Sequence, residues 1–279
     1  MNPKKTSIVE VTIMYLFITI TSIAIFYPLI WTIGMSFNQG MSLYSSSIIP
    51  ENFSLDHYRW LFSVNSDYLL WYKNSLIVSV SVTVGSVIMT SLVAYAFSRY
   101  QFVGKKNALY IFLLLQMFPV MMAMVALYVF LNMIGMLDTL TGLIFVYLGG
   151  QIPFNAWLVK GYIDTIPREL DEAARIDGAG HLRVFWSIVL PLAKPILAVV
   201  GLFNFMMPLF DFLLPSIVLS SKENYTLAVG LFNFINDQFA NNFTRFAAGS
   251  ILVAVPVAAV YLYLQRYLIS GLTAGGTKG

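Results

Sequence analysis

Six stretches of the sequence are apolar over the length that a helix needs to cross a lipid bilayer. A span takes about 20 apolar residues, because the hydrocarbon core is roughly 30 Å thick and a helix rises about 1.5 Å per residue. Five stretches carry no charged residue and the sixth carries one, Asp211; they cover residues 11–34, 75–97, 108–131, 142–159, 196–219 and 246–264. We therefore expect an all-α polytopic transmembrane bundle of about six spans, with residues 1–279 forming a single domain.

The composition also indicates that lipid is the main solvent. Only 10% of the residues are charged, whereas a soluble domain carries roughly 25%. The chain has no cysteine, which excludes disulfides and thiolate metal sites. His57 and His181 fall in loops between the predicted spans, which argues against a haem held between helices and against an H-E-x-x-H metalloprotease. We expect no catalytic residue, no metal site and no nucleic-acid partner.

The distribution of positive charge predicts the orientation. Lys4 and Lys5 precede the first apolar stretch, as in a signal peptide, but the apolar run is too long and no cleavage pattern closes it. We therefore interpret it as a retained span. Twelve of the 16 lysines and arginines lie in the segments on the same side as both termini. The positive-inside rule places that side, and both termini, in the cytoplasm of a multi-pass cell-membrane protein. On the opposite side, the aromatic-rich segment 35–74 suggests a folded cap.

The most charged part of the chain, residues 160–195, lies between the fourth and fifth apolar stretches. Pro167 suits the first turn of a helix, and three acidic residues follow it at the positive end of the helix dipole. Ala173 and Ala174 favour a helix and let another backbone approach closely. Gly178 is placed to end that helix in the left-handed conformation. A short helix with a small-residue face, projecting from the membrane, suits a groove on a partner protein.

This segment resembles the EAA loop of membrane-spanning subunits of ATP-binding-cassette importers. That pattern reads E-A-A, two residues, D-G-A, then a gap that ends in an apolar residue, L-P and a later P. The matching residues here are Glu172, Ala173, Ala174, Asp177, Gly178, Ala179, Ile188, Leu190, Pro191 and Pro195. The resemblance implies that 160–195 is a cytoplasmic coupling loop. It assigns ATPase docking to Glu172, Ala173, Ala174, Asp177, Gly178, Ala179 and Pro191.

Further segments are similar to the sugar-importer branch of this family, in particular its maltose and maltodextrin type. These are PFNAWLVKGYIDTIPREL upstream of the loop, NYTLAVG at 224–230 and the C-terminal QRYLISGLTAGGTKG. The resemblance implies a C-terminal ATPase contact through Gly271, Leu272, Thr273, Ala274, Gly275, Gly276 and Lys278. Many sugar permeases carry a Trp-Asn-Asp/Glu run in the fifth span. This chain has Leu209, Phe210 and Asp211 there, so only the acid is shared.

The resemblance implies a set of partners for the chain. No G-x-x-x-x-G-K run occurs in the sequence, so the chain has no phosphate-binding loop of its own. A pair of separate ATPase subunits would bind ATP and Mg²⁺, and the chain itself would carry no cofactor and would not be an enzyme. A homologous second permease would complete the pathway, and an extracytoplasmic sugar-binding protein would deliver the substrate.

Four polar residues inside the predicted spans are candidates for the transport pathway: Gln116, Asn155, Asn204 and Asp211. The amides could bind sugar hydroxyls or could bond neighbouring helices. Because a charge at mid-bilayer costs about 2.5–3.5 kcal/mol on insertion scales, Asp211 should face a cavity or a partner subunit, be protonated, or lie near the outer face.

Three functions remain open at this point. The resemblance favours the permease subunit of an ATP-driven sugar importer, for maltodextrin or for another oligosaccharide or sugar-like solute. A self-sufficient ion-coupled carrier predicts paired half-repeats or several intramembrane charges, and neither is evident. A receptor or scaffold without transport would leave the cytoplasmic motif without a purpose.

Overall fold

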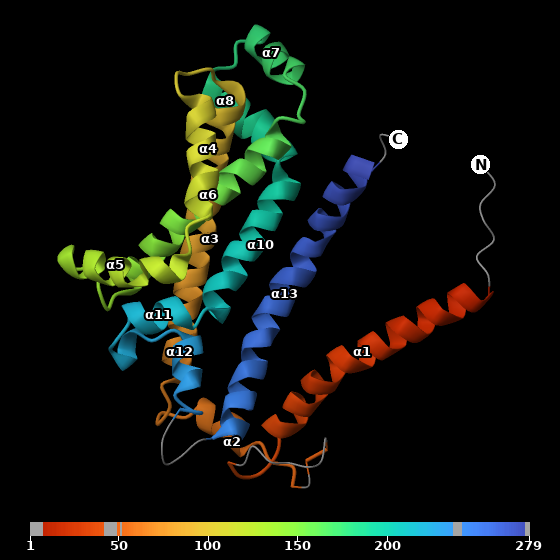
Figure 1. Ribbon diagram of the computed structural model, residues 1–279, viewed down its shortest axis with the longest axis vertical. Coiled ribbons are helices and arrows are strands. Elements are labelled where there is room, and N and C mark those ends of the chain that lie inside the picture. Colours follow the sequence, from red (N-terminus) through yellow and green to blue (C-terminus); the bar gives the residue numbers. More distant parts are fainter. Residues whose placement is uncertain (1–7, 42–48, 51, 237–241, 277–279) are drawn as a thin grey trace. The chain divides into compact units, whose positions relative to one another are not determined.

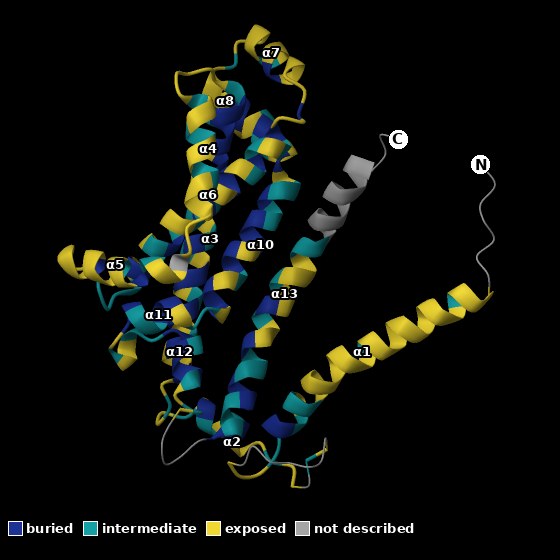
Figure 2. Cartoon of the chain, in the orientation of Figure 1, coloured by how far each residue is buried: buried dark blue, intermediate teal, exposed yellow. Residues whose placement is uncertain are grey.

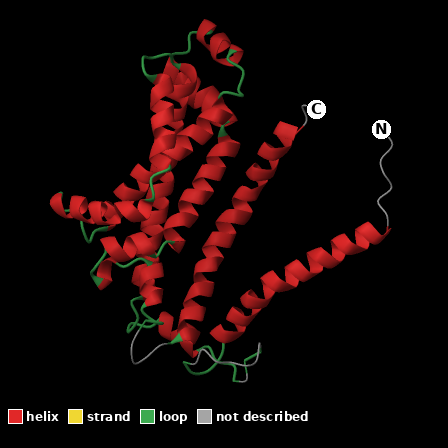
Figure 3. Ribbon diagram, in the orientation of Figure 1, coloured by secondary structure: helices red, strands yellow, loops and turns green. Residues whose placement is uncertain are grey.

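The computed structural model describes residues 8–41, 49, 50, 52–236 and 242–276, and the regular structure within them is helical apart from one isolated bridge between Asn38 and Phe53 (Figures 1 and 3). The predicted all-α class is confirmed. The helices are α1 Ile8–Ser36, α2 Asp56–Leu61, α3 Tyr68–Arg99, α4 Lys105–Gln116, α5 Val120–Met133, α6 Leu140–Ile163, α7 Glu169–Ile176, α8 His181–Val184, a π-helical turn Phe185–Val189, α9 Leu190–Leu192, α10 Lys194–Phe210, α11 Leu213–Val218, a 3₁₀ turn Lys222–Asn224, α12 Leu227–Phe232 and α13 Phe243–Gly276.

In the described part of the chain, four helices are long and apolar enough to cross a membrane by themselves: α1, α3, α6 and α13. They contain the predicted spans 11–34, 75–97, 142–159 and 246–264. Two further pairs of helices pass the same test only when taken together. One pair is α4 with α5, bent by 101°, and the other is His181–Leu192 with α10, bent by 77°. The total of about six spans therefore depends on counting each bent pair as one.

The apolar stretch predicted as a span over residues 108–131 is not one continuous helix. The helix stops after Gln116 and resumes at Val120 as α5. Pro119 has an extended ψ of 113°. Its ring removes a backbone donor, and it disfavours the helical region for the residue before it. Pro119 therefore interrupts the helix completely instead of only kinking it.

The apolar stretch predicted as a span over residues 196–219 is also interrupted. Helix α10 ends at Phe210, and Asp211 takes an extended ψ of 121°. The Asp211 carboxylate accepts the backbone N–H of Leu213 at 2.9 Å, at the start of α11. A side chain that bonds its own backbone two residues on stabilises a turn in competition with the helix. Asp211 therefore ends one helix and starts the next.

The described residues divide by their contacts into two units. The described residues within 1–66 and 231–253 form unit 1, and those within 67–230 and 254–279 form unit 2. A single domain over residues 1–279 stays a prediction.

The core of unit 2 forms where α3 packs against α6 and α10. Ser79, Ser86 and Thr90 lie buried at 0% exposure along α3. Small side chains of this kind let helix backbones approach closely within a membrane. Around them, the apolar core includes Val78 and Leu143 at one level and a second cluster at the Arg99 end of α3. These close contacts of α3 with α6 and α10 hold the three helices together, although most side chains of the chain are apolar.

Unit 1 contains α1, whose apolar side chains are almost all exposed along its length (Figure 2). The part of the predicted outer cap in this unit is folded. The rings of Phe37 and Phe53 stack at 5.1 Å, beside the Asn38–Phe53 bridge. Tyr58 Oη donates to Ser36 Oγ at 2.8 Å. Sequence placed both histidines in loops, but His57 lies buried in α2 and His181 begins α8.

An aspartate in the link between α5 and α6 ties the polar segment after α11 to the rest of unit 2. Asp138 has a positive φ of 55°. Its carboxylate accepts the N–H groups of Ser220 and Ser221 at 2.8 and 3.0 Å and also the Ser221 hydroxyl. Burial raises the pKa of Asp138, but these hydrogen bonds outweigh it and hold the pKa below its ordinary value. The ionised carboxylate is therefore the form that the fold stabilises.

Replacing Asp138 with Asn should lower stability at neutral pH, because an amide cannot accept all these donors. The expected loss is about 1.5–3 kcal/mol, the range for hydrogen bonds to a charged group. The lowered pKa in the fold means that this stabilisation is complete above the unfolded value near 3.8 and disappears as pH falls through the lower folded value. Melting temperatures in detergent, measured from pH 7 downward, should converge for the two proteins. A constant difference at every pH would contradict this account.

A glycine at the start of α6 is required by packing. A Cβ on Gly142 would lie 2.2 Å from the carbonyl oxygen of Met136, whereas a Cβ on Gly161 of the same helix meets nothing within 4 Å. Gly142→Ala should therefore destabilise the protein by about 1–3 kcal/mol through overpacking. Gly161→Ala should be neutral or slightly stabilising, because Ala favours helix. Loss of the monodisperse peak on heating measures both. Equal behaviour of the two variants would refute the packing requirement.

Candidate functional site

The predicted coupling loop forms a helical segment at the end of unit 2 that carries Arg99, the last residue of α3 (Figure 1). Helix α7 starts at Glu169, with Arg168 at its N-cap. Pro167 therefore lies just before the helix instead of in its first turn. Acidic residues fill the first turn of α7 and Arg175 occupies its last turn. This charge order suits the helix dipole at both ends.

The D-G-A part of the motif ends α7 with a Schellman turn. Gly178 has a φ of 82°, in the left-handed region, as predicted. Its N–H donates to the carbonyl of Arg175 at 3.0 Å, and the N–H of Ala179 donates to the carbonyl of Ala174 at 2.9 Å. These two bonds satisfy carbonyls that the end of the helix would otherwise leave open. Glycine is favoured at the left-handed position because it has no Cβ.

A buried ion pair fixes α7 to α3. Arg99 Nε lies 2.7 Å from Asp171 Oδ2, and the two side chains are only 3% and 6% exposed. Arg99 also donates to the carbonyl of Ile166 at 3.0 Å. A buried charge without a partner is costly, so this pair holds the position and rotation of α7. In the sequence, Arg99 was only one of the twelve positive residues that predict the orientation, and Asp171 was only one of the three acidic residues that follow Pro167.

A second set of polar contacts surrounds this ion pair. Ser98 Oγ donates to Asp164 Oδ1 at 2.6 Å, and Lys160 forms an ion pair with the other oxygen of that carboxylate. The guanidinium of Arg168 donates to the carbonyl of Ser98 at 3.0 Å. The end of α3, the end of α6 and the entry to α7 are therefore joined in one network. A displacement of α7 would be transmitted directly to both long helices.

The stretch after α7 packs into the core of unit 2. Val184, Phe185 and Val189 are almost fully buried among residues from α3, α6 and α10. The π-helical turn ends at Val189, two residues before Pro191. Proline lacks the N–H that an α-helix needs and cannot approach the carbonyl of the preceding turn closely. The chain then bends by 77° at Ala193 into α10. This bend lies between Pro191 and Pro195, the two prolines of the EAA pattern.

The side of the segment that faces away from the core carries most of the predicted docking residues. Glu172, Ala173, Asp177, Gly178 and Pro191 are exposed, while Ala174 and Ala179 are half-buried against the core. Sequence analysis missed three large apolar side chains of the same segment, Ile176, Leu182 and Trp186, which are exposed by 86%, 71% and 57%. Exposed apolar residues of this size beside exposed acids mark an interaction surface. We call these eight exposed residues the docking face.

The structure separates the four candidate pathway residues. Gln116 lines a hollow of about 390 Å³ together with Tyr147, Gln151 and Met207. Asp211 accepts a hydrogen bond from Tyr147 Oη at 2.9 Å, so it borders this hollow indirectly. Asn155 and Asn204 are buried in α6 and α10, respectively, and do not line it; Asn204 donates to Val200 of its own helix. Gln151 was missed, although it is an amide within the predicted span 142–159.

The backbone of the predicted C-terminal contact is helical. Helix α13 continues to Gly276 and so includes Gly271, Leu272, Thr273, Ala274, Gly275 and Gly276. Their side chains, and the whole of Lys278, lie outside the described residues. The C-terminal ATPase contact stays a prediction.

Comparison with known proteins shows the family to which this chain belongs. Residues 86–273 match the family model described as binding-protein-dependent transport system inner membrane component. The chain belongs to this family of inner-membrane transport subunits. The resemblance inferred from the EAA loop is therefore confirmed.

Similar proteins cover nearly the whole chain. The galactooligosaccharides transport system permease protein GanQ of Bacillus subtilis is 49% identical over 95% of this chain and 94% of its own length. The maltodextrin transport system permease protein MdxG of the same organism is 48% identical over 100% of both chains. The maltose/maltodextrin transport system permease protein MalG of Escherichia coli is 38% identical over 96% of this chain and 95% of its own length.

A solved structure shares the fold. The crystal structure of a bacterial ABC transporter involved in the import of the acidic polysaccharide alginate contains a chain that is 25% identical to this one, with a TM-score of 0.82. The match covers 95% of this chain and 98% of that chain. The same helical architecture therefore occurs within an assembled transporter.

Replacing Asp171 should destabilise the segment far more than replacing another acid of the same helix. Asp171→Ala leaves Arg99 buried without its counter-charge, which costs about 3–5 kcal/mol. Glu169→Ala is the matched control, because Glu169 is exposed on α7, and its effect should stay within about 0.5 kcal/mol. Melting temperature in detergent and the rate of protease cleavage between residues 160 and 195 measure both.

A double variant separates the charge from the packing. Arg99→Met with Asp171→Leu replaces the pair with apolar side chains of similar volume, which is often neutral. It should restore most of the stability lost in Asp171→Ala. If Asp171→Ala and Glu169→Ala have the same melting temperature, the ion pair does not anchor α7.

Proposed function

We propose that this chain is the membrane-spanning permease subunit of an ATP-driven, binding-protein-dependent importer of oligosaccharides, of the maltodextrin or galactooligosaccharide kind. Family membership supports the transport role. The substrate class is supported by full-length similarity to permeases whose names specify maltodextrin and galactooligosaccharides. The chain itself performs no reaction in this proposal, and ATP and Mg²⁺ are bound by separate subunits.

The observation that carries the proposal is a helix that is exposed on one side and anchored on the other. The docking face leaves Glu172, Ala173 and Ile176 open for a partner. On the opposite side, Asp171 is locked to Arg99. A partner that moves α7 therefore moves α3 and, through the contacts of Ser98 with Asp164, also α6. This arrangement suits a coupling element driven by an ATPase pair.

The remaining partners follow from the same proposal. A homologous second permease would complete the pathway, and the exposed apolar surface of α1 suits burial in lipid or against such a subunit. A sugar-binding protein would dock on the extracytoplasmic side. For the alginate transporter, a structure in complex with a pentasaccharide-bound periplasmic protein exists. Both termini and the segment 160–195 would lie in the cytoplasm, as the positive charges indicate.

Closure of the ATPase pair on ATP would push α7 along the membrane normal or rotate it. The network at the ends of α3 and α6 would transmit that motion to the helices around the hollow lined by Gln116 and Gln151. These two amides offer donors and acceptors suited to sugar hydroxyls. The hollow would then open alternately to the two sides of the membrane.

The left-handed glycine gives a sharp test of coupling. Gly178→Val forces a β-branched residue to a φ of 82°, whereas Gly180→Val occupies an ordinary φ of −71° with open space around its Cβ. Gly178→Val should abolish uptake of labelled maltodextrin or galactooligosaccharide, and Gly180→Val should retain most of it. Gly178→Asn should keep partial uptake, because Asn tolerates the left-handed region. All three variants should reach the membrane at normal levels.

Co-purification identifies what the docking face holds. Tagged wild-type chain extracted in mild detergent should bring down an ATPase and a second permease, and Glu172→Lys should lose the ATPase while keeping the permease. Glu223→Lys, an exposed charge reversal at the other end of unit 2, is the control. Sugar uptake by this chain alone, without an ATPase subunit, would overturn the proposal in favour of a self-sufficient carrier.

A further inference from the structure

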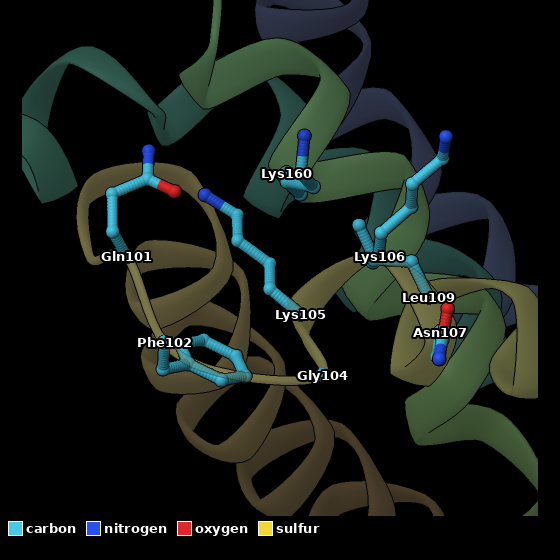
Figure 4. Close-up of a pocket in the computed structure, with 8 residues that line it drawn as sticks. All are labelled: Gln101, Phe102, Gly104, Lys105, Lys106, Asn107, Leu109 and Lys160. Carbon is cyan, nitrogen blue, oxygen red and sulfur yellow. The ribbon is translucent and has the colours of Figure 1, made fainter.

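Three lysines line one hollow at the predicted cytoplasmic end of unit 2. Lys105 and Lys106 come from the first turn of α4, and Lys160 comes from the last turn of α6. They line a cavity of about 500 Å³ together with Phe102 and Leu109. In the view of Figure 4 the three side chains point toward the top of the picture, with the ammonium group of Lys160 between those of Lys105 and Lys106. Among the described residues that line this cavity there is no aspartate or glutamate.

The positive charge of this cavity is only partly compensated. Asp164 forms an ion pair with Lys160 and also accepts the hydroxyl of Ser98. Lys105 donates to the carbonyl of Tyr100 at 2.9 Å, which leaves its charge unneutralised. Lys106 is exposed at the rim. Three lysines with one acid between them favour an anionic ligand. The positive-inside rule explains why lysines lie on this side of the membrane, but it does not explain why three of them line one cavity.

An apolar groove continues from the lysine cavity. This second hollow, of about 410 Å³, shares Leu109 and Lys160 with the first and extends over Trp157, Leu158 and Ile196. Its wall comes from α4, α6 and α10. Trp157 is 44% exposed, and tryptophan favours the level of lipid headgroups. A charged cavity that opens into an apolar groove matches a molecule with an anionic head and a hydrocarbon tail.

We propose that these two hollows form a binding site for an anionic phospholipid of the cytoplasmic leaflet. The phosphate would lie among Lys105, Lys106 and Lys160, and an acyl chain would lie along Trp157, Leu158 and Ile196. Basic cavities between transmembrane helices on the cytoplasmic side bind lipid headgroups in this way. The groove distinguishes this ligand from free phosphate, which needs the lysines alone. The site lies beside Asp164 and Ser98, so an occupied site would brace the network that anchors α7.

Native mass spectrometry of the full chain, purified in mild detergent with its associated subunits, tests the proposal. Phosphatidylglycerol and phosphatidylcholine with the same acyl chains are added in separate titrations. Lys105→Gln with Lys106→Gln removes two positive charges from the cavity and leaves Lys160 with its partner. Lys73→Gln with Lys194→Gln removes the same charge at exposed positions outside it. Size-exclusion chromatography confirms that each variant is folded.

The wild type should retain phosphatidylglycerol in preference to phosphatidylcholine, and inorganic phosphate should not displace it. Each lysine near a lipid surface contributes about fivefold in affinity, so the cavity variant should bind phosphatidylglycerol more weakly by at least 10-fold, and the control should bind normally. Ile196→Arg should weaken binding with all lysines intact.

Several results would overturn the proposal. Equal binding by the cavity variant and the control would remove the lysine site, and displacement by inorganic phosphate would identify a free-anion site instead. Equal retention of both lipids would reduce the groove to an unselective acyl contact. Cross-linking of a cysteine at residue 196 to a second permease, without retained lipid, would assign the groove to a subunit interface.

Discussion

The ion pair between Arg99 and Asp171 is the interaction on which the candidate site depends. Both charges are almost completely removed from water, so neither tolerates loss of the other. Helix α7 is only eight residues long, and a helix of that length has little stability by itself. Its place on the protein is therefore set by the buried pair, by the Schellman turn at Gly178 and by packing of Ala174 and Ala179 against the core. Fixed on one side, α7 can present a docking face on the other.

The same need to satisfy polar groups explains where the long helices are interrupted. Pro119 removes a donor and separates α4 from α5, and Asp211 accepts backbone N–H groups and separates α10 from α11. Both interruptions border the hollow lined by Gln116 and Gln151. Irregular backbone at membrane depth is tolerated where it is buried in protein or lines a cavity. The breaks and the hollow are therefore two aspects of one feature.

The two ends of unit 2 are held together by different sets of polar contacts. At one end, Asp138 and its hydrogen bonds hold the segment around Ser221 against the link between α5 and α6. At the other end, the network of Ser98, Asp164 and Arg168 joins three helices beneath the docking face. The lysine cavity lies next to this second network through Lys160. The lipid proposed for it would therefore contact the region through which ATPase motion would reach the spans.

Patterns that are local in the sequence predicted the fold class, the positions of four long helices, the end of α7 and the family. The apolar runs predicted the all-α class and the positions of α1, α3, α6 and α13, because a bilayer imposes a minimum helix length. Gly178 predicted the end of α7, since only local backbone geometry is involved. The EAA pattern predicted the family, which the comparisons confirmed.

Contacts between distant residues were decided only by the tertiary structure. The pairing of Arg99 with Asp171, the contact of Tyr147 with Asp211 and the cavity lined by both Lys105 and Lys160 each join residues more than 50 positions apart. Sequence periodicity carries no information about which of many charged or polar groups will meet. The break at Pro119 was also beyond sequence, because a proline in a membrane helix produces either a kink or a full interruption according to how neighbouring helices satisfy the freed backbone groups.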